Sequence, residues 1–297
     1  MNTEQQRQAK QYFDKIYSEW QKKANGEYSN EFNVIRRRND YVMGVLSRKE
    51  SVQNVLDVGC GTGALIVSIA KKHSNVNAFG VDFSEKMIET ANELKHSEKC
   101  KNAQFEAVDI FSYDFQNEEY DLISCNGFIE YINFDQLHAL IRLAKKRLKP
   151  EGSFVFSSRN RLMNITSFNE YTEEEINNGN LIHLIKEAIF LCQNKNIADY
   201  SGFNVIPFQD HQRIQKNSKV EVAQRFQYTP IQLIKLISDY GFTPIGICPV
   251  NIHATSSYFK KEYPEINLKI SNSLQEFAES STYLLPFSST FSIHCLK

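Results

Sequence analysis

Residues 55–63, VLDVGCGTG, decide the fold class of this 297-residue chain. The β-branched stretch from Val52 to Val58 predicts a short buried strand, and three glycines follow it directly. A helix is expected to begin near Thr62. Glycines at such a strand-to-helix turn let the backbone bend sharply and let a ligand approach it closely. The segment therefore predicts a nucleotide-type binding loop.

The alternation of strand and helix continues on both sides of this loop. Strands are predicted at 76–81, 103–108, 120–125, 153–157, 243–250 and 289–296. Helices are predicted at 3–23, 30–48, 84–94, 134–148, 181–193 and 230–240. Strands that alternate with helices of these lengths indicate right-handed crossovers and a mainly parallel sheet. We expect an α/β, Rossmann-like fold.

Four regions follow from this pattern. We expect an N-terminal helical cap at 1–50 and a cofactor-binding α/β core at 51–158. An insertion at 159–228, where the rhythm breaks and Asn, Gln, Glu and aromatic residues gather, is expected to form a lid. Residues 229–297 then complete the sheet.

The composition of the chain bears on its binding partners and on the cellular compartment in which it works. With a formal net charge of −1, the protein has no overall electrostatic attraction for nucleic acid or for an anionic membrane. No apolar run approaches the length of about 20 residues that a membrane span needs. Six cysteines are scattered singly, which favours reduced thiols in a cytoplasmic protein over a disulfide scaffold or a metal site. The oligomeric state stays open.

The spacing of the glycines favours one class of cofactor. A dinucleotide loop follows Gly-x-Gly-x-x-Gly, whereas here the third glycine, Gly63, comes one position early. Asp57 precedes the loop, where its carboxylate would repel a pyrophosphate and suit an ammonium group. An NAD-dependent oxidoreductase is therefore the weaker alternative. The lysine-containing phosphate loop of NTPases is absent from the sequence.

Two further aspartates end the next two strands. Asp82 is placed to accept hydrogen bonds from ribose hydroxyls, and Asp109 to accept one from an adenine amino group. Phe83 and Ile110 would supply apolar walls. A single aspartate is more often a helix cap or turn residue. Three at the carboxyl ends of successive strands converge on one edge of the sheet.

Four segments in order resemble class I S-adenosylmethionine-dependent methyltransferases of the bacterial small-molecule type. They are residues 55–63, 80–88 (GVDFSEKMI), 120–132 (YDLISCNGFIEYI) and 148–153 (LKPEGS), and the resemblance covers 50–158. It implies S-adenosyl-L-methionine as cofactor and a seven-stranded sheet whose last strand is antiparallel. The residues it places at the cofactor, beside those already named, are Gly59, Cys60, Gly61, Met87, Asn126 and Gly127.

The N-terminal helices are expected to contribute to the same site. In relatives of this type such helices often close over the donor, so Tyr17 and Trp20 are expected to touch it. Arg38, the last of three consecutive arginines, is a candidate cation for the carboxylate of the donor. The simpler interpretation is that the aromatic residues belong to a packing stripe and that the arginines lie on a solvated helix face.

Candidates on the acceptor side carry weaker signals. His253 follows the sixth strand and is a candidate base or acceptor ligand, although a packed or surface histidine is the more frequent case. Glu130 is a second catalytic candidate, with ordering of its own loop as the alternative. Arg159, Asn160, Arg161 and His211 are candidates to bind an anionic or polyhydroxylated acceptor, or else to solvate and cap loops.

These observations favour O-methylation of a small polar metabolite or glycan precursor. The tetrapeptide Asn/Asp-Pro-Pro-Tyr/Phe, which in this superfamily marks methylation of planar nitrogens, is absent. The alternatives are an N-methyltransferase of an amino sugar or other small amine, an RNA methyltransferase, and a catalytically inactive partner protein that binds S-adenosylmethionine. The basic face expected of an enzyme acting on RNA is not evident in the sequence.

Overall fold

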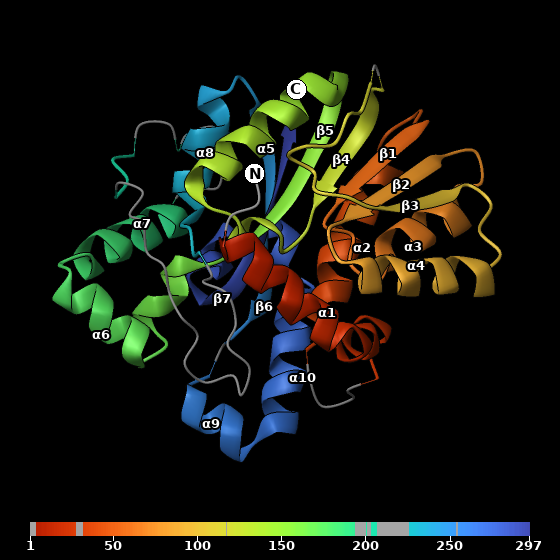
Figure 1. Ribbon diagram of the computed structural model, residues 1–297. Coiled ribbons are helices and arrows are strands. Elements are labelled where there is room, and N and C mark those ends of the chain that lie inside the picture. Colours follow the sequence, from red (N-terminus) through yellow and green to blue (C-terminus); the bar gives the residue numbers. More distant parts are fainter. Residues whose placement is uncertain are drawn as a thin grey trace.

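A computed structural model describes residues 4–27, 32–116, 118–193, 200, 203–206, 226–253 and 255–297. Its centre is a seven-stranded sheet in the order β3-β2-β1-β4-β5-β7-β6 (Figure 1). The strands are β1 (Asn54–Val58), β2 (Asn77–Asp82), β3 (Ala103–Ala107), β4 (Tyr120–Cys125), β5 (Leu148–Arg159), β6 (Thr243–Ile252) and β7 (Ser288–Leu296). β1 to β5 pair in parallel, and β7 runs antiparallel to both β5 and β6. The predicted fold, including the antiparallel last strand, is confirmed.

Helices cover both faces of this sheet. They are α1 (Glu4–Asn25), α2 (Val34–Ser47), α3 (Ala64–Lys72), α4 (Glu85–Ser97), α5 (Phe134–Arg147), α6 (Glu170–Asn177), α7 (Leu181–Gln193), α8 (Pro230–Asp239), α9 (Ser257–Glu262) and α10 (Pro264–Gln275). Short 3-10 helices lie at η1 (Ile129–Tyr131), η2 (Arg161–Ile165), η4 (Ala278–Ser280) and η5 (Thr282–Phe287). α2 and α3 pack on one face, and α5 and α8 on the other.

The strands bury side chains on both faces, as strands of a parallel sheet covered on both sides do. Val55 and Leu122 point toward α2 and α3, whereas Leu56 and Ile123 belong to the core under α5 and α8. All four side chains are fully buried. Because successive side chains in a strand point to opposite faces, one short strand contributes to both halves of the core.

The structure differs from the sequence-based expectation in one strand and in three helices. β5 begins at Leu148, where α5 ends, five positions before the expected 153–157. The turn at Glu151, with φ of +59°, therefore lies within the strand as an irregularity in its pairing with β4. The helices α6, α9 and α10 were not expected. A capping box between Asn169 and Thr172 starts α6, which is short and acidic.

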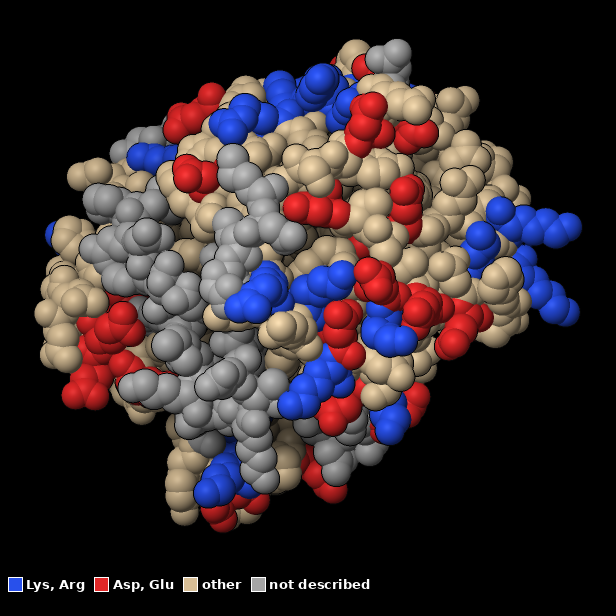
Figure 2. All heavy atoms as spheres, viewed as in Figure 1, with Lys and Arg blue, Asp and Glu red and all other residues tan. Residues whose placement is uncertain are grey.

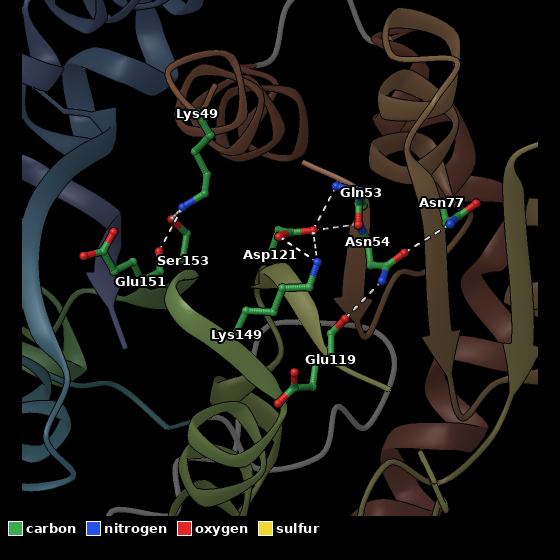
Figure 3. A network of polar contacts seen from close by, with 9 residues as sticks. All are labelled: Lys49, Gln53, Asn54, Asn77, Glu119, Asp121, Lys149, Glu151 and Ser153. Carbon is green, nitrogen blue, oxygen red and sulfur yellow. Dashed lines mark hydrogen bonds and ion pairs between the residues drawn. The ribbon is translucent and has the colours of Figure 1, made fainter. Parts of the chain in front are cut away.

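A polar network joins the amino ends of β1, β2, β4 and β5, at the end of the sheet opposite the glycine loop (Figure 3). One carboxylate oxygen of Asp121 accepts hydrogen bonds from the backbone N–H groups of Gln53 and Asn54, at 2.8 and 2.9 Å. Both oxygens of Asp121 accept from Nζ of Lys149, each at 2.9 Å. A single side chain of β4 therefore anchors the start of β1 and the start of β5.

The described part of the insertion shares the main core. Leu162, Leu184, Leu191 and Tyr200 are fully buried in the cluster that also contains β5 and α8. In the ranges that the structure describes, no helix is long and apolar enough to cross a bilayer. Those ranges also hold no group of three or more side chains suited to a metal ion. All six cysteines are free thiols.

Candidate functional site

A cavity lies over the glycine loop at the carboxyl ends of β1, β2 and β4. We call it the loop cavity. α1 crosses the centre of the molecule in front of these strand ends (Figure 1) and supplies one wall. The predicted cofactor residues in its lining are Asp57, Gly59, Cys60, Gly61, Asp82, Phe83, Met87, Asp109, Ile110, Asn126, Gly127 and Arg38. Sequences far apart in the chain thus meet at one site.

The glycine loop adopts a backbone that other residues disfavour. Gly59 has φ of +71° and Gly63 has φ of +78°, both in the left-handed region. A Cβ on Gly59 would stand 2.7 Å from the ring of Phe128, and one on Gly63 would stand 2.6 Å from Phe105. The loop is tied to the neighbouring strand because Gly59 donates its N–H to the carbonyl of Val81 at 2.8 Å. Conformation and space both require glycine here.

Two buried carboxylates flank this loop. Asp57 accepts a hydrogen bond from the Ser124 hydroxyl at 2.7 Å, and burial raises the pKa of Asp57 to about 7. Asp82 accepts from the N–H groups of Gly61 at 3.0 Å and Ser84 at 2.9 Å. Burial raises the pKa of Asp82 to about 6, against these hydrogen bonds, which favour the ionised form. A cationic or hydrogen-bond-donating ligand would stabilise both carboxylates.

Asp109 follows β3 at the same edge of the sheet. Its Oδ1 accepts a hydrogen bond from the N–H of Phe111 at 3.1 Å, so the side chain also shapes its own turn. The adjacent Ile110 is buried, and Phe83 lines the same cavity. The three aspartates predicted from the strand ends therefore do face a common space.

The side-chain amide of Asn126 indicates that this cavity suits a polar ligand. Its side-chain Oδ1 and Nδ2 are both buried, and neither has a hydrogen-bond partner within the described residues. The next residue, Gly127, donates its N–H to the Ser157 hydroxyl at 2.8 Å, which holds this turn in place. Buried polar atoms without a partner are costly and rare in proteins. A ligand with donors and acceptors in the cavity would satisfy both atoms of Asn126.

α1 is held over the cavity by aromatic and polar contacts. Phe13 makes edge-to-face contacts with Tyr131, Trp20 and Phe83, at centroid distances of 5.1, 5.7 and 6.3 Å. The Ser84 hydroxyl donates to Asp14 at 2.5 Å and joins α1 to the start of α4. Phe13 was not among the residues predicted to lie at the cofactor. Its only signal is a spacing of seven from Trp20, which puts both on one helix face.

The two N-terminal aromatic candidates separate in the structure. Trp20 lines the cavity, with its indole Nε1 3.3 Å from the point where a Cβ on Gly61 would lie. Tyr17 is 37% exposed and is absent from the cavity lining. The expectation that Tyr17 touches the donor is therefore not supported, because its position on α1 directs it away from the loop.

A second cavity adjoins the first and opens beside the ends of β5 and β6 and the start of β7. We call it the rim cavity. It shares Trp20, Ile35, Arg38 and Tyr131 with the loop cavity. The rest of its described lining is Tyr12, Ile16, Glu19, Lys23, Gly26, Phe32, Asn33, Val34, Glu130, Arg159, Asn251, Ser289 and Thr290. Two of the acceptor-side candidates, Glu130 and Arg159, lie here.

The structure directs Asn160 and Arg161 elsewhere. Asn160 is fully buried and donates from Nδ2 to the carbonyls of Leu285 and Ser288, at 2.7 and 2.9 Å. Arg161 makes a buried, two-pronged ion pair with Glu175 at 3.0 and 2.8 Å. Neither lines the loop cavity or the rim cavity, and the proposed acceptor role is corrected, since both side chains lock η2 into the fold.

Of the two candidate histidines, the structure describes only His253. His253 lines neither cavity, and its backbone N–H donates to Phe287 at 2.7 Å. Burial, with a smaller effect of Lys260, lowers its pKa to about 4, and its Nε2 has no partner among the residues described. The packed interpretation of His253 fits this position. His211 lies outside the described residues.

Comparisons with known proteins agree with this geometry. A family model described as a methyltransferase domain matches residues 49–221, more than half of the chain. A ubiquinone biosynthesis O-methyltransferase of Hydrogenovibrio crunogenus is 31% identical over 137 residues, 45% of this chain and 54% of that protein. An uncharacterized protein of Rickettsia prowazekii is 29% identical over 108 residues, 36% of this chain and 43% of its own length. The chain thus spans about half the length of these curated relatives.

One solved structure shows the same fold at low identity. The magnesium protoporphyrin IX methyltransferase of Synechocystis PCC 6803, crystallised with bound SAH, superposes with a TM-score of 0.50 at 14% identity. The superposition covers 87% of this chain and 81% of that one.

Proposed function

This chain belongs to the family of proteins with a methyltransferase domain, and we propose that it transfers a methyl group from S-adenosylmethionine to a small polar acceptor. The observation that carries the proposal is the loop cavity, where three strand-end carboxylates and the unpartnered amide of Asn126 face one space. A zwitterionic nucleoside with a ribose diol and an adenine amino group offers a partner to each of them.

The residues divide into three groups along such a ligand. Asp57 would hold the ammonium group, while Asp82 would accept hydrogen bonds from the ribose hydroxyls. Asp109 and the apolar walls at Phe83 and Ile110 would bind the adenine. The side-chain amide of Asn126 would form hydrogen bonds with the amino-acid end of the cofactor, because Asn126 follows β4 next to the glycine loop.

Methyl transfer of this kind depends more on alignment of the acceptor atom with the methyl group than on acid or base catalysis by the protein. When bound, S-adenosylmethionine supplies a methyl group on a sulfonium, which is already a good leaving group. The chain therefore has to orient the acceptor atom and exclude water. The aromatic contacts of Phe13 and Trp20 place an apolar wall over the glycine loop, as water exclusion requires.

Oxygen is the acceptor atom that we propose. One relative bears the name of an O-methyltransferase and matches 45% of this chain, which supports this choice. Acidic and basic side chains are mixed on the face that carries α1 (Figure 2), a pattern that suits a small acceptor better than RNA. Glu130 and His253 remain candidates for a base. Glu130 lies in the rim cavity, whereas His253 would have to act from outside both cavities.

Calorimetric titration with S-adenosylhomocysteine tests the cofactor, with NAD as the control ligand. Micromolar binding of the first and none of the second is the expected result. Folded protein that binds NAD and ignores S-adenosylhomocysteine would overturn the proposal. Turnover assays with labelled S-adenosylmethionine then sort hydroxyl-bearing from amine-bearing acceptors, and methylation of amines alone would contradict O-methylation.

A further inference from the structure

Among the described residues, the rim cavity contains a cluster of two guanidinium groups and one carboxylate, without a second carboxylate to balance the charge. The Nε of Arg159 donates to Glu130 Oε2 at 2.6 Å, and Nη2 of Arg38 lies 3.6 Å from Glu130 Oε1. Two guanidinium groups therefore share one carboxylate. The side chains of Arg38 and Glu130 are 9% and 5% exposed, whereas that of Arg159 is 34% exposed, so the second positive charge meets the cavity at Arg159.

The remaining charges of the lining do not remove the imbalance. The described lining carries the cations Lys23, Arg38 and Arg159 against the carboxylates Glu19 and Glu130. Glu19 and Lys23 lie on the exposed side of α1, so they are solvated and leave the buried cluster as it is. A buried excess charge is unfavourable unless a counter-charge pairs with it.

Arg159 is the member of the cluster that remains open. Its side chain is 34% exposed, and it lines the rim cavity but not the loop cavity. Apart from the bond from Nε to Glu130, Arg159 has no hydrogen-bond or ion-pair partner among the residues described, and its two Nη groups bond to none of them. Arg38, by contrast, lines both cavities, with Nη1 2.5 Å from the point where a Cβ on Gly127 would lie.

Neutral polar groups complete the wall beside Arg159. Asn251, the residue before the last one of β6, has φ of +56°, and its Nδ2 donates to the Ser289 hydroxyl at 2.8 Å. Thr290 pairs with Arg159 across β5 and β7. The guanidinium group is thus carried by a strand end within the sheet, which fixes its position better than a loop would.

We propose that the rim cavity is the acceptor site and that it binds the acceptor through an anionic group, a carboxylate or a phosphate, seated on the guanidinium of Arg159. This inference rests on the proposed function. A planar guanidinium offers two parallel N–H donors to either kind of oxyanion. The shared residues Trp20, Ile35, Arg38 and Tyr131 put this anchor next to the methyl donor. Glu130 is then a positioning residue that orients Arg159.

The test uses pairs of small probes that differ only in the anionic group, with the protein saturated with S-adenosylhomocysteine. One pair is 3-hydroxybenzoate and 3-hydroxybenzyl alcohol, and the other is glycerol 3-phosphate and glycerol. Calorimetry on the full chain should show that at least one anionic probe binds about tenfold or more tightly than its neutral partner. The pair that shows the preference identifies carboxylate or phosphate as the group recognised.

Variants assign the preference to Arg159. Arg159→Gln should abolish the difference within each pair, and Arg159→Lys should restore part of it, since lysine keeps the charge but not the two-pronged geometry. Lys22→Gln, at an exposed residue of α1 outside both cavity linings, is the charge-matched control and should leave the preference unchanged.

The outcomes separate this inference from the proposed function. Binding of S-adenosylhomocysteine, measured for every variant, reports on the fold and on the donor site, and should change less than about twofold in Arg159→Gln. A wild-type protein that binds S-adenosylhomocysteine but shows no preference for the anionic probes overturns the anionic acceptor alone. A preference that persists in folded Arg159→Gln overturns the role of Arg159. Failure to bind S-adenosylhomocysteine at all overturns the proposed function instead.

Discussion

Asp82 shows at the scale of one residue how a strand end presents a carboxylate to the loop cavity. Its carboxylate holds the N–H groups of Gly61 and Ser84, and its unused lone pairs remain for ribose hydroxyls. Asp82→Ala should weaken S-adenosylhomocysteine binding at least tenfold, about 1.4 kcal/mol or more, in calorimetric titration. Asp135→Ala, at an exposed residue of α5, is the control. Unchanged affinity in a folded Asp82→Ala variant would remove the ribose from this position.

Asp57 predicts a pH dependence of donor binding. Burial raises its pKa to about 7, and an ammonium group beside it would favour the ionised form and lower that pKa. Binding is then coupled to loss of a proton, so affinity should rise with pH up to about 7 and level off above it. The slope cannot exceed about tenfold per pH unit for one proton.

The measurement for Asp57 is the dissociation constant of S-adenosylhomocysteine between about pH 5.5 and pH 8. Asp57→Asn should bind more weakly and lose most of the dependence near neutral pH. Below about pH 6 the protonation of Asp82 adds to the slope in both proteins. An affinity of the wild type that is flat across the whole range would mean that Asp57 does not pair with the ammonium group.

Among the elements, α1 carries the clearest prediction. The ring of Phe13 on α1 contacts Phe83, the residue after β2, and Tyr131 in η1. These contacts hold α1 over the loop cavity. Phe13→Ala should remove part of this wall and speed the release of S-adenosylhomocysteine by about tenfold, because aromatic contacts of this kind contribute about 0.5–1.5 kcal/mol beyond their buried area. Stopped-flow displacement measures this rate. Gln11→Ala, exposed on the same helix, should release the ligand at the wild-type rate.

The junction of η2 and α6 depends on a buried ion pair. Arg161 and Glu175 are 2% and 0% exposed and bond through two contacts. Arg161→Ala leaves the carboxylate of Glu175 without its counter-charge and should lower the free energy of unfolding by about 3–5 kcal/mol in urea titrations. The double variant Arg161→Met, Glu175→Leu should lose less, since it removes both charges. If the single variant were as stable as wild type, the pair would not lock this junction.

At the scale of the whole molecule, Asp121 connects strands that are distant in the chain. It joins β4 to the starts of β1 and β5, and its side chain is 15% exposed (Figure 3). Asp121→Ala should lower the free energy of unfolding by about 1–3 kcal/mol, the usual cost of losing hydrogen bonds to a charged group. Glu119→Ala is a neighbouring control, because only the backbone carbonyl of Glu119 enters the network.

The effect of Asp121 should also depend on pH. Burial acts to raise its pKa, but hydrogen bonds from Asn54, Gln53 and Lys149 outweigh burial and hold the pKa below its usual value. A carboxyl group with a lowered pKa stabilises the fold above the pKa of the unfolded chain, about 3.9, and this contribution is lost as the pH falls through the folded value. The stability difference between wild type and Asp121→Ala should therefore shrink below about pH 4.

Local patterns in the sequence were enough for the sheet and for the three strand-end aspartates that line the loop cavity. Strand alternation, the glycine loop and the aspartates at 57, 82 and 109 are short-range signals, because each depends on a few consecutive residues and on the strand ends meeting at one edge. All three aspartates line the loop cavity as expected. The extra helix α6 was missed, since its signal is a capping box rather than an apolar stripe.

The arrangement of side chains in the rim cavity was decided only by the tertiary structure. Arg38, Glu130 and Arg159 are separated by 29 or more positions in the chain, and nothing in their local sequence indicates that one carboxylate serves two guanidinium groups. Where β5 ends, Arg159 faces the rim cavity, whereas Asn160 and Arg161 turn into the protein, because the partners that hold them lie in η5 and α6. A linear pattern specifies which side chains reach the edge of a sheet, but the packing of distant elements determines which of them face the ligand.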